Sequence, residues 1–253
     1  CVNMFVNNDQ TRVYVLGRQN QRIYQFNLSA AGNLGSGYYT GTSLYIGTNS
    51  TFGESFPCGL AFSVDGSRMY FSGETTRRIW EYNLTTPWEL STARFAGAES
   101  WYKTYIGGYE RDPRGLRFGD NGNKFYIIGA DARNYGGITG ASITEFTCET
   151  PYTLFNAQVT GRFNLRSQTT TPHSLYFRPD GYQCWVGGST YPPKIHVYNL
   201  GTAWDIDTAS HAFTWTVPPG QNQNPGGCGP YNTVRVYATA SGSSSVWGSN
   251  PYL

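Results

Sequence analysis

Residues 62–93, FSVDGSRMYFSGETTRRIWEYNLTTPWELSTA, recur with changes three more times in this chain of 253 residues. With Leu60 as the anchor, four segments align: 4–28, 60–84, 116–148 and 175–200. The first three copies start 56 residues apart, and the fourth starts 59 residues after the third. The third copy carries eight extra residues, within ADARNYGGITGAS. Self-similarity at such a fixed period predicts a fold built from repeated supersecondary units.

Each copy has the same local pattern of strands and turns. A short apolar strand leads into Asp65-Gly66, or into Asn121-Gly122 or Asp180-Gly181. These pairs accept positive φ and predict a two-residue hairpin. A second strand, a variable loop and a third strand with alternating apolar and polar residues follow, and then the segment TTPWELSTA at 85–93 or its counterpart. Candidates for a closing fourth strand are residues 43–47, 101–107, 159–165 and 212–217.

Four antiparallel strands in every repeat, without helical periodicity, predict an all-β fold: a β-propeller of four-stranded antiparallel blades. We expect one propeller domain over residues 1–253, with blades at about 1–53, 54–109, 110–168 and 169–224. Residues 225–253 contain TVRVYATA and SSSVW, which predict a partial fifth blade or strands that close the ring with the N-terminal segment. A ring that continues in residues outside this chain is a third alternative.

Composition narrows the classes of partner. Charged residues make up 13% of the chain, aromatic residues 16%, and the net charge is +2 without a basic run. We therefore expect no nucleic-acid partner, because such binding rests on clustered positive charge. We also expect no membrane span, because no apolar run approaches about 20 residues.

The five cysteines form no CxxC pair, so we expect no zinc site of the usual spacing and no other metal. Cys1 and Cys228 are candidates for a disulfide that ties the two ends of the chain together in an oxidising environment. The alternative, buried small apolar residues, applies above all to Cys148 and Cys184, which lie inside strand patterns. Because the first residue is Cys rather than Met, we expect a processed chain or a fragment.

The pattern of residues 57–93, with L-x-F-S-x-D-G-x-x-M-Y followed by I-W-E-Y-N-L-T-T-P-W-E-L-S-T-A, resembles β-propeller repeats of the YVTN and WD40-like kind. Residues 113–157 and 172–209 follow the pattern with changes. The resemblance implies a propeller from a secreted, cell-surface or phage-associated protein. It implies no catalytic residue, because the repeat motif contains none, and propellers serve many functions.

One rim of the predicted propeller combines the loops between strands 2 and 3 with the loops that join successive blades. Pro57, Pro113 and Pro172 are equivalent there, and Cys58, Arg114 and His173 follow them close to the central channel. The third and fourth blades add longer loops, and binding residues tend to lie on such loops. The candidate ligand- or partner-binding residues on this rim are Arg114, His173, Tyr135 and Tyr191; the alternative is that they are solvated loop residues.

On the opposite rim, Trp88 and Trp204 are equivalent, with Tyr152 in the third blade. A recurring exposed aromatic residue can stack on sugar rings, so both tryptophans are also binding candidates. The alternative is that they fill the gap between adjacent blades, which the neighbouring Pro87 and Leu90 favour.

Three sequons predict possible N-glycosylation at Asn27, Asn49 and Asn83. Asn27 and Asn83 share their blade position with Asn199, which has no hydroxyl residue two positions later. The shared asparagine is therefore alternatively a strand-end turn former.

Catalytic signals are weak. No HExxH, GxSxG or P-loop pattern occurs, and Asp112 is the one acid beside the channel-proximal positions. One acid makes a poor divalent-cation site, so we expect no cofactor. We assign His196 to the strand position of Gln25, Glu81 and Glu145.

These observations predict a non-enzymatic extracellular structural or interaction module, displayed on a cell, filament or virion surface. We expect it to bind a protein partner or copies of itself through its rims or its outer edge strands, which carry few charges. The first alternative is a carbohydrate-binding propeller, and the second is an extracellular enzyme of the lactonase type.

Overall fold

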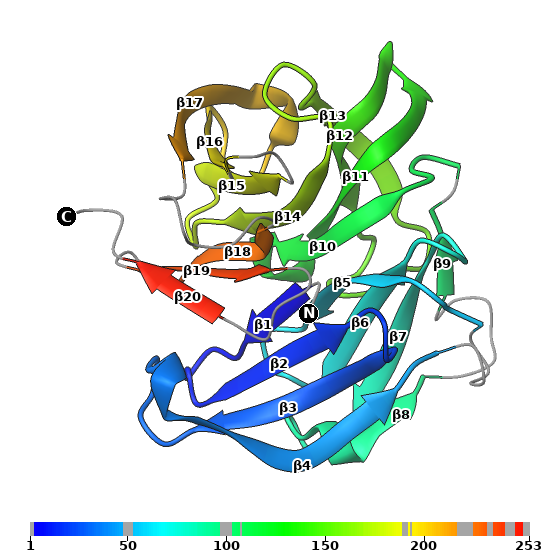
Figure 1. Cartoon of the computed structure of the whole chain (residues 1–253). Helices are drawn as coiled ribbons and strands as arrows, with labels where there is room; N and C mark the ends of the chain where they lie inside the picture. The colour runs from blue at the N-terminus through cyan, green and yellow to red at the C-terminus, as the bar shows by residue number, and fades with distance from the viewer. Residues whose placement is uncertain are drawn as a thin grey trace.

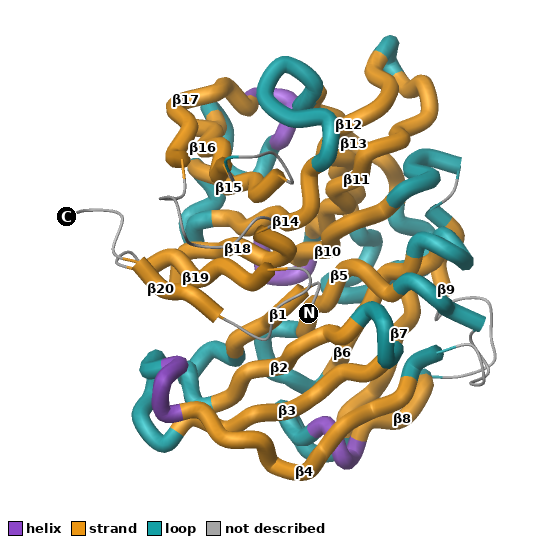
Figure 2. The backbone as a smooth tube through the Cα atoms, viewed as in Figure 1, coloured by secondary structure: helices purple, strands orange, loops and turns teal. Residues whose placement is uncertain are grey.

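The computed structural model describes residues 3–47, 53–96, 103–106, 108–188, 192, 194–216, 225–231, 235–240 and 246–249. For residues 103–105, for Tyr135 and after residue 216, the description is limited to the backbone. The described chain consists of antiparallel strands, short 3-10 turns and loops, without an α-helix (Figures 1 and 2). No helix in this part of the chain has the length and apolar character to cross a membrane.

Four sheets of the same topology form the blades, and each runs in sequence order from the inner to the outer strand. The first blade contains β1 (Asn3–Val6), β2 (Arg12–Gly17), β3 (Arg22–Leu28) and β4 (Gly37–Tyr45). The second contains β5 (Pro57–Phe62), β6 (Arg68–Gly73), β7 (Arg78–Leu84) and an outer strand in two pieces, β8 (Ala93–Phe95) and β9 (Lys103–Tyr105).

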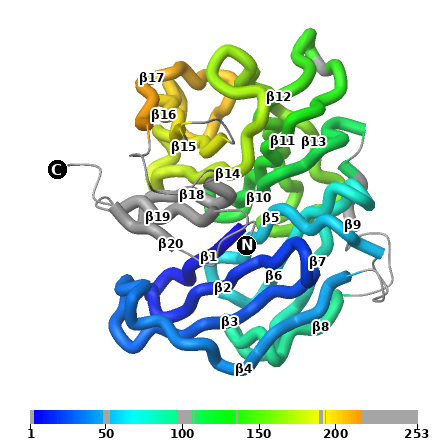
Figure 3. Tube along the Cα trace, in the orientation of Figure 1, coloured from blue at the N-terminus to red at the C-terminus, as the bar shows by residue number. Residues whose placement is uncertain are grey.

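The third blade contains β10 (Pro113–Gly119), β11 (Lys124–Tyr135), β12 (Ile138–Thr147) and β13 (Gln158–Asn164). The fourth contains β14 (Pro172–Phe177), β15 (Gln183–Gly188), β16 (Lys194–Leu200) and β17 (Ala209–Thr216). Consecutive blades are neighbours in space, as the colour sequence in Figure 3 shows. The predicted all-β propeller of four-stranded blades is confirmed.

A three-stranded sheet follows the fourth blade, with β18 (Pro225–Tyr231), β19 (Arg235–Ala240) and β20 (Val246–Ser249). Its first strand, β18, packs beside β14 and β15 and also contacts β1, so this sheet stands between the fourth and the first blade (Figure 1). The assignment of residues 225–253 to a partial fifth blade or to a ring-closing segment stays a prediction.

Four inner strands, β5, β10, β14 and β18, share an irregularity that was not predicted from the sequence. The pairing register shifts between Pro57 and Gly59, between Pro113 and Gly115, and between Pro172 and Ser174. The same shift occurs in β18, between Pro225 and Gly227. Each of these four strands begins with a proline followed by a β-bulge, a feature that turns one side chain away from the regular alternation of the strand. The described part of β1 pairs with β2 in regular register from Asn3 to Val6.

The first hairpin of the blade differs from the predicted two-residue turn. In the second blade, the Ser63 carbonyl accepts a hydrogen bond from the N–H of Gly66 (3.0 Å), and the Ser63 N–H donates to the Arg68 carbonyl (2.9 Å). The connection is thus a four-residue loop built on a β-turn, and the two-residue prediction was wrong. Gly66 has a φ of +72°, and Gln10 takes the same left-handed region in the first blade with a φ of +65°.

The outer strands of the first and fourth blades begin earlier than predicted. Single 3-10 turns at Leu34–Ser36, Leu90–Thr92 and Ile206–Thr208 reverse the chain. The strand therefore follows the turn directly, at Gly37 and Ala209 rather than at residues 43 and 212.

The hydrophobic core lies between the blades. Tyr14, Leu16 and Ile23 of the first blade form one buried cluster with Leu60 and Phe71 of the second. Two further clusters join the second blade to the third and the third to the fourth. Adjacent blades thus bury the apolar faces of each other's sheets, which a single sheet cannot do. The repeats are therefore stable only when they pack side by side.

Candidate functional site

The recurring aromatic residues Trp88 and Trp204 pack between adjacent blades. The Trp88 ring lies against Phe5 of the first blade and Phe62 of the second, with ring centroids 6.1 and 5.5 Å apart. Trp204 lies 5.4 Å from Phe177, and a Cβ on Gly119 of the preceding blade would collide with its ring. Both rings occupy the gap that the packing interpretation assigns to them. A role for either in ligand binding stays a prediction.

A set of hydrogen bonds to these same loops joins each blade to the next. The Trp88 carbonyl accepts hydrogen bonds from the Tyr14 hydroxyl and from Arg12, both on the first blade. We call the first of these the inter-blade tyrosine bond; it recurs from Tyr70 to the Tyr152 carbonyl and from Tyr126 to the Trp204 carbonyl, each at 2.6 Å. Burial raises the pKa of each of the three phenols, which keeps the hydroxyls protonated donors.

In the fourth blade, Trp185 stands at the position of these tyrosines. The sequence assignment of His196 in this blade needs correction. Trp185 pairs with Val197 across the sheet, as Tyr70 pairs with Glu81 in the second blade. Val197, not His196, therefore occupies the position of Gln25, Glu81 and Glu145, and the assignment of His196 was wrong by one residue. In a strand, a shift of one residue moves a side chain to the opposite face.

Two of the predicted rim residues meet at the inner end of the blades. Arg114 lies at the bulge of β10, and its guanidinium donates to both carboxylate oxygens of Asp112, at 2.8 and 2.6 Å. Its Nη1 atom lies 3.0 Å from Nε2 of His173, the bulge residue of β14. Because the guanidinium can only donate, His173 accepts through Nε2 and carries its proton on Nδ1.

The surroundings fix the charge of these groups. Burial, and then the positive charge of Arg114, lowers the pKa of His173 to about 4, so the imidazole is neutral at pH 7. Cys58, the bulge residue of β5, is buried and free, and burial raises its pKa to about 12. Arg18 and Glu74 form a further ion pair on this rim. The cluster is therefore polar and internally paired rather than primed for nucleophilic chemistry.

Beneath this rim, the same repeat position holds a buried acid in two blades. Glu54 accepts hydrogen bonds from the N–H groups of Phe56, Thr75 and Thr76 and from the Thr76 hydroxyl. Its carboxylate thus ties the loop that enters the blade to the loop between strands 2 and 3. The equivalence of Glu54 and Glu110, three residues before the repeated proline, was visible in the sequence and was missed.

Glu110 makes fewer bonds than Glu54. Its Oε1 atom accepts from the N–H groups of Asp112 and Asp131, both at 2.9 Å, whereas its buried Oε2 atom has no hydrogen-bond partner among the described residues. Burial is the largest cause of its raised pKa of about 7, which the two N–H bonds oppose. Glu110 therefore carries a proton more readily than an ordinary glutamate.

The long insertion in the third blade is a strand extension rather than the long loop expected. Strands β11 and β12 continue through it, with Ala132 opposite Gly140 and Tyr135 opposite Ile138. Gly136 and Gly137, with φ of +58° and +84°, make the two-residue turn at the tip. Two consecutive positive φ values are what a tight hairpin connection requires.

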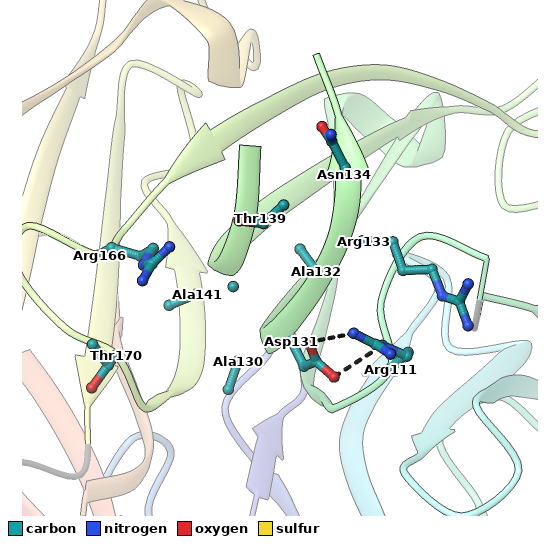
Figure 4. Close-up of a pocket in the computed structure, with 11 residues that line it drawn as sticks. Arg111, Ala130, Asp131, Ala132, Arg133, Asn134, Thr139, Ala141, Arg166 and Thr170 are labelled. Atoms are coloured by element: carbon teal, nitrogen blue, oxygen red, sulfur yellow. Dashed lines mark hydrogen bonds and ion pairs between the residues drawn. The ribbon is translucent and has the colours of Figure 1, made fainter. Parts of the chain in front are cut away.

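A pocket with a volume of about 540 Å³ lies beside this extended hairpin (Figure 4). It is lined by residues of β11 and β12 and by Arg111, Arg166 and Thr170 from the loops that enter the third and fourth blades. Arg111 forms an ion pair with Asp131, with 3.0 Å between Nε and Oδ2. Arg133 and Asn134, which belong to the predicted long loop, also line the pocket.

The base of the hairpin is held by a buried arginine on β13. Arg162 donates hydrogen bonds to the carbonyl oxygens of Arg133 and Tyr109 and to the Thr144 hydroxyl. The Arg133 N–H donates in turn to the Tyr109 carbonyl, at 2.9 Å. The pocket is therefore mounted on a fixed support rather than on a loosely attached loop.

Several residues predicted as binding, disulfide or glycosylation sites are described only through their backbone or lie outside the described residues. The backbone of Tyr135 ends β11, whereas Tyr191, Asn49 and Cys1 fall outside the described residues, and Cys228 is described through its backbone in β18. Asn83 is exposed and Asn27 half-buried on their third strands. The disulfide, the glycosylation sites and the binding role of both tyrosines stay predictions.

Within the part of the chain that the structure describes, no group of three or more His, Cys, Asp or Glu side chains is arranged to hold a metal ion. Asp112, the acid that the sequence places beside the channel-proximal positions, accepts two hydrogen bonds from the Arg114 guanidinium.

Fold and rim together define the molecule as a β-propeller. No family model matches the chain, and no curated protein matches its sequence. Solved structures do match. A candidate 6-phosphogluconolactonase from Bacteroides fragilis has a TM-score of 0.57 at 11% identity, over 97% of this chain and 64% of its own. Another from Bacteroides uniformis has a TM-score of 0.52 at 13% identity, over 97% and 65%.

A nidogen–laminin complex also contains a similar chain, with a TM-score of 0.57 at 13% identity, over 98% of this chain and 75% of the other. The present chain thus spans about two thirds of the length of the two lactonase-like neighbours. At these identities the likeness establishes the propeller fold and leaves activity open.

Proposed function

We propose that this chain is a non-enzymatic extracellular interaction module of the YVTN or WD40-like kind, which binds a protein partner through the rim that carries Arg114, His173 and the β11–β12 hairpin. The observation that carries the proposal is the pocket of about 540 Å³ beside this hairpin. An insertion in one blade of a repeated scaffold, supported by a buried arginine, is a typical way to present a binding surface.

The charges on the rim support binding rather than catalysis. The charge of Arg114 is balanced by Asp112, and Arg114 also hydrogen-bonds to His173, which is neutral at pH 7. The described rim offers no cysteine with a lowered pKa, since burial raises that of Cys58. The nidogen neighbour was solved in a protein complex, which accords with a propeller that binds another protein.

A carbohydrate-binding propeller is the second candidate, because hydroxyl and amide groups of Thr139, Asn134 and Thr170 also line the pocket. The names of the two Bacteroides neighbours keep a lactonase as a third candidate. Both are outcomes of the experiment below.

The experiment compares the wild-type protein with the double variant Arg133→Met, Arg166→Met on an array of extracellular protein domains and on a glycan array. Arg94→Met, on the exposed outer strand β8, removes the same kind of charge far from the pocket and serves as the control. We expect at least one array protein to bind wild type and the control and to lose binding to the double variant. Binding confined to glycans, or turnover of a lactone by the wild type, would overturn the proposal.

A further inference from the structure

The pocket beside the β11–β12 hairpin is lined by small residues and by side chains that donate hydrogen bonds (Figure 4). Ala130, Ala132, Gly140 and Ala141 contribute no polar side-chain atoms. Asn134, Thr139, Thr170 and Arg166 line it with an amide, two hydroxyls and a guanidinium. A volume of about 540 Å³ suits a short segment of chain rather than a folded domain.

The one acid among the lining residues is already neutralised. Both oxygens of Asp131 lie 3.0 Å from guanidinium nitrogens of Arg111, in the paired geometry drawn in Figure 4. The Asn134 Oδ1 atom accepts the N–H of Gly137 at 3.1 Å, so its amide N–H groups remain as donors. The pocket therefore presents donors in excess, and its complement is an anionic group.

Arg166 is a pocket-lining cation in a position to meet that group. Its side chain lies over Gly140, where an added Cβ would come within 3.3 Å of Arg166 Cδ and where φ is +76°. None of the ion pairs formed by the described residues includes Arg166. A planar guanidinium over a glycine is suited to a two-point contact with a carboxylate.

The same pocket runs along a free strand edge. Strand β12 pairs with β13 from Ser142 to Thr147, and the last bond on that side joins the Leu165 N–H to the Ala141 carbonyl. In the described structure, Ile138, Thr139 and Gly140 therefore have no strand beside them on the β13 side, although they pair with β11 on the other. Such an edge offers N–H and C=O groups to an added strand.

We propose that the site binds an extended acidic peptide, which adds as a strand along Ile138–Gly140 and places a carboxylate on Arg166. The proposal rests on the proposed function and specifies the partner's chemistry. The free edge favours a peptide over a sulfated sugar, because a peptide supplies alternating N–H and C=O groups at strand spacing. The alternative is that Arg166 only prevents copies of the chain from pairing along this free edge. In that case the edge binds no peptide.

The test uses fluorescence anisotropy with a fluorescein-labelled peptide of three Thr-Glu repeats. We expect Arg166→Met to raise Kd at least tenfold, as for loss of a charged hydrogen bond, while Arg94→Met stays within twofold of wild type. The same peptide with N-methyl groups on alternate amides should bind at least tenfold more weakly, because it cannot complete a strand ladder. A Thr-Lys peptide should not bind.

Three results would overturn the inference: equal affinity in wild type and Arg166→Met, equal affinity of the N-methylated peptide, or binding of a heparin hexasaccharide in place of the acidic peptide. The failures of the two proposals are distinguishable. An array protein that binds this rim without competition from the acidic peptide refutes the inference alone, whereas the absence of any rim-dependent protein on the array refutes the proposed function.

Discussion

Replacing Tyr70 with Phe removes one inter-blade tyrosine bond and leaves the ring in place. The lost bond, 2.6 Å long, joins the Tyr70 hydroxyl to the Tyr152 carbonyl of the next blade. That carbonyl keeps a second donor, Arg68 Nη1 at 3.2 Å, so the substitution does not leave it unpaired. The cost is therefore that of one neutral hydrogen bond, about 1 kcal/mol, rather than the larger penalty for an orphaned buried carbonyl.

Urea-induced unfolding, followed by tryptophan fluorescence, measures this loss. Tyr38→Phe is the matched control, because Tyr38 is 55% exposed on the outer strand of the first blade. The triple change at Tyr14, Tyr70 and Tyr126 should cost about 3 kcal/mol, since the three hydroxyls lie at different interfaces and share no acceptor. If the triple variant unfolds at the same urea concentration as the control, these hydroxyls do not hold the blades together.

Three further expectations follow from the structure. Trp88→Ala should lower the free energy of unfolding by about 3 kcal/mol, because it empties the gap between Phe5 and Phe62; a loss below 1 kcal/mol in urea unfolding would contradict this role. Because the folded pKa of Glu110, about 7, exceeds its ordinary value of 4.5, its contribution to stability is present below pH 4.5 and is lost as pH rises to 7. Glu110→Gln should therefore remove a decline of about 3 kcal/mol across this range, and an unchanged pH profile of unfolding would refute the assignment. Cys58, with a pKa of about 12, should resist iodoacetamide at pH 8 in the folded protein and react after unfolding, as mass spectrometry of its peptide will show.

The sequence predicted those parts of the fold that depend on local chemistry. Asp65-Gly66 and its counterparts mark the turns, and alternating residues such as those of 79–84 mark the strands, because both signals arise within a few residues of chain. The β-bulge at Arg114 and His173 depends on how two strands pair, so the proline before each residue was read as repeat equivalence and not as the mark of a bulge. The hairpin tip at Gly136-Gly137 did leave a local signal, which the interpretation of the insertion as a long loop overlooked.

The candidate site was predicted in part. Arg114 and His173 were placed on one rim from repeat equivalence alone, and the structure brings their side chains within 3.0 Å. Arg166 was not singled out, because the pocket arises where the extended hairpin of one blade passes the entry loop of the next. Such a juxtaposition depends on tertiary packing, which no short stretch of sequence encodes.

The inter-blade tyrosine bonds also set an order for biosynthesis. Tyr14 bonds a residue 74 positions further along the chain, Tyr70 one 82 positions away and Tyr126 one 78 positions away. As the polypeptide leaves the ribosome, each sheet must wait for most of its successor to emerge before its tyrosine finds an acceptor. Folding during synthesis is therefore expected to proceed blade by blade from the N-terminus. At each stage, the blade made last still lacks its tyrosine bond to the next one.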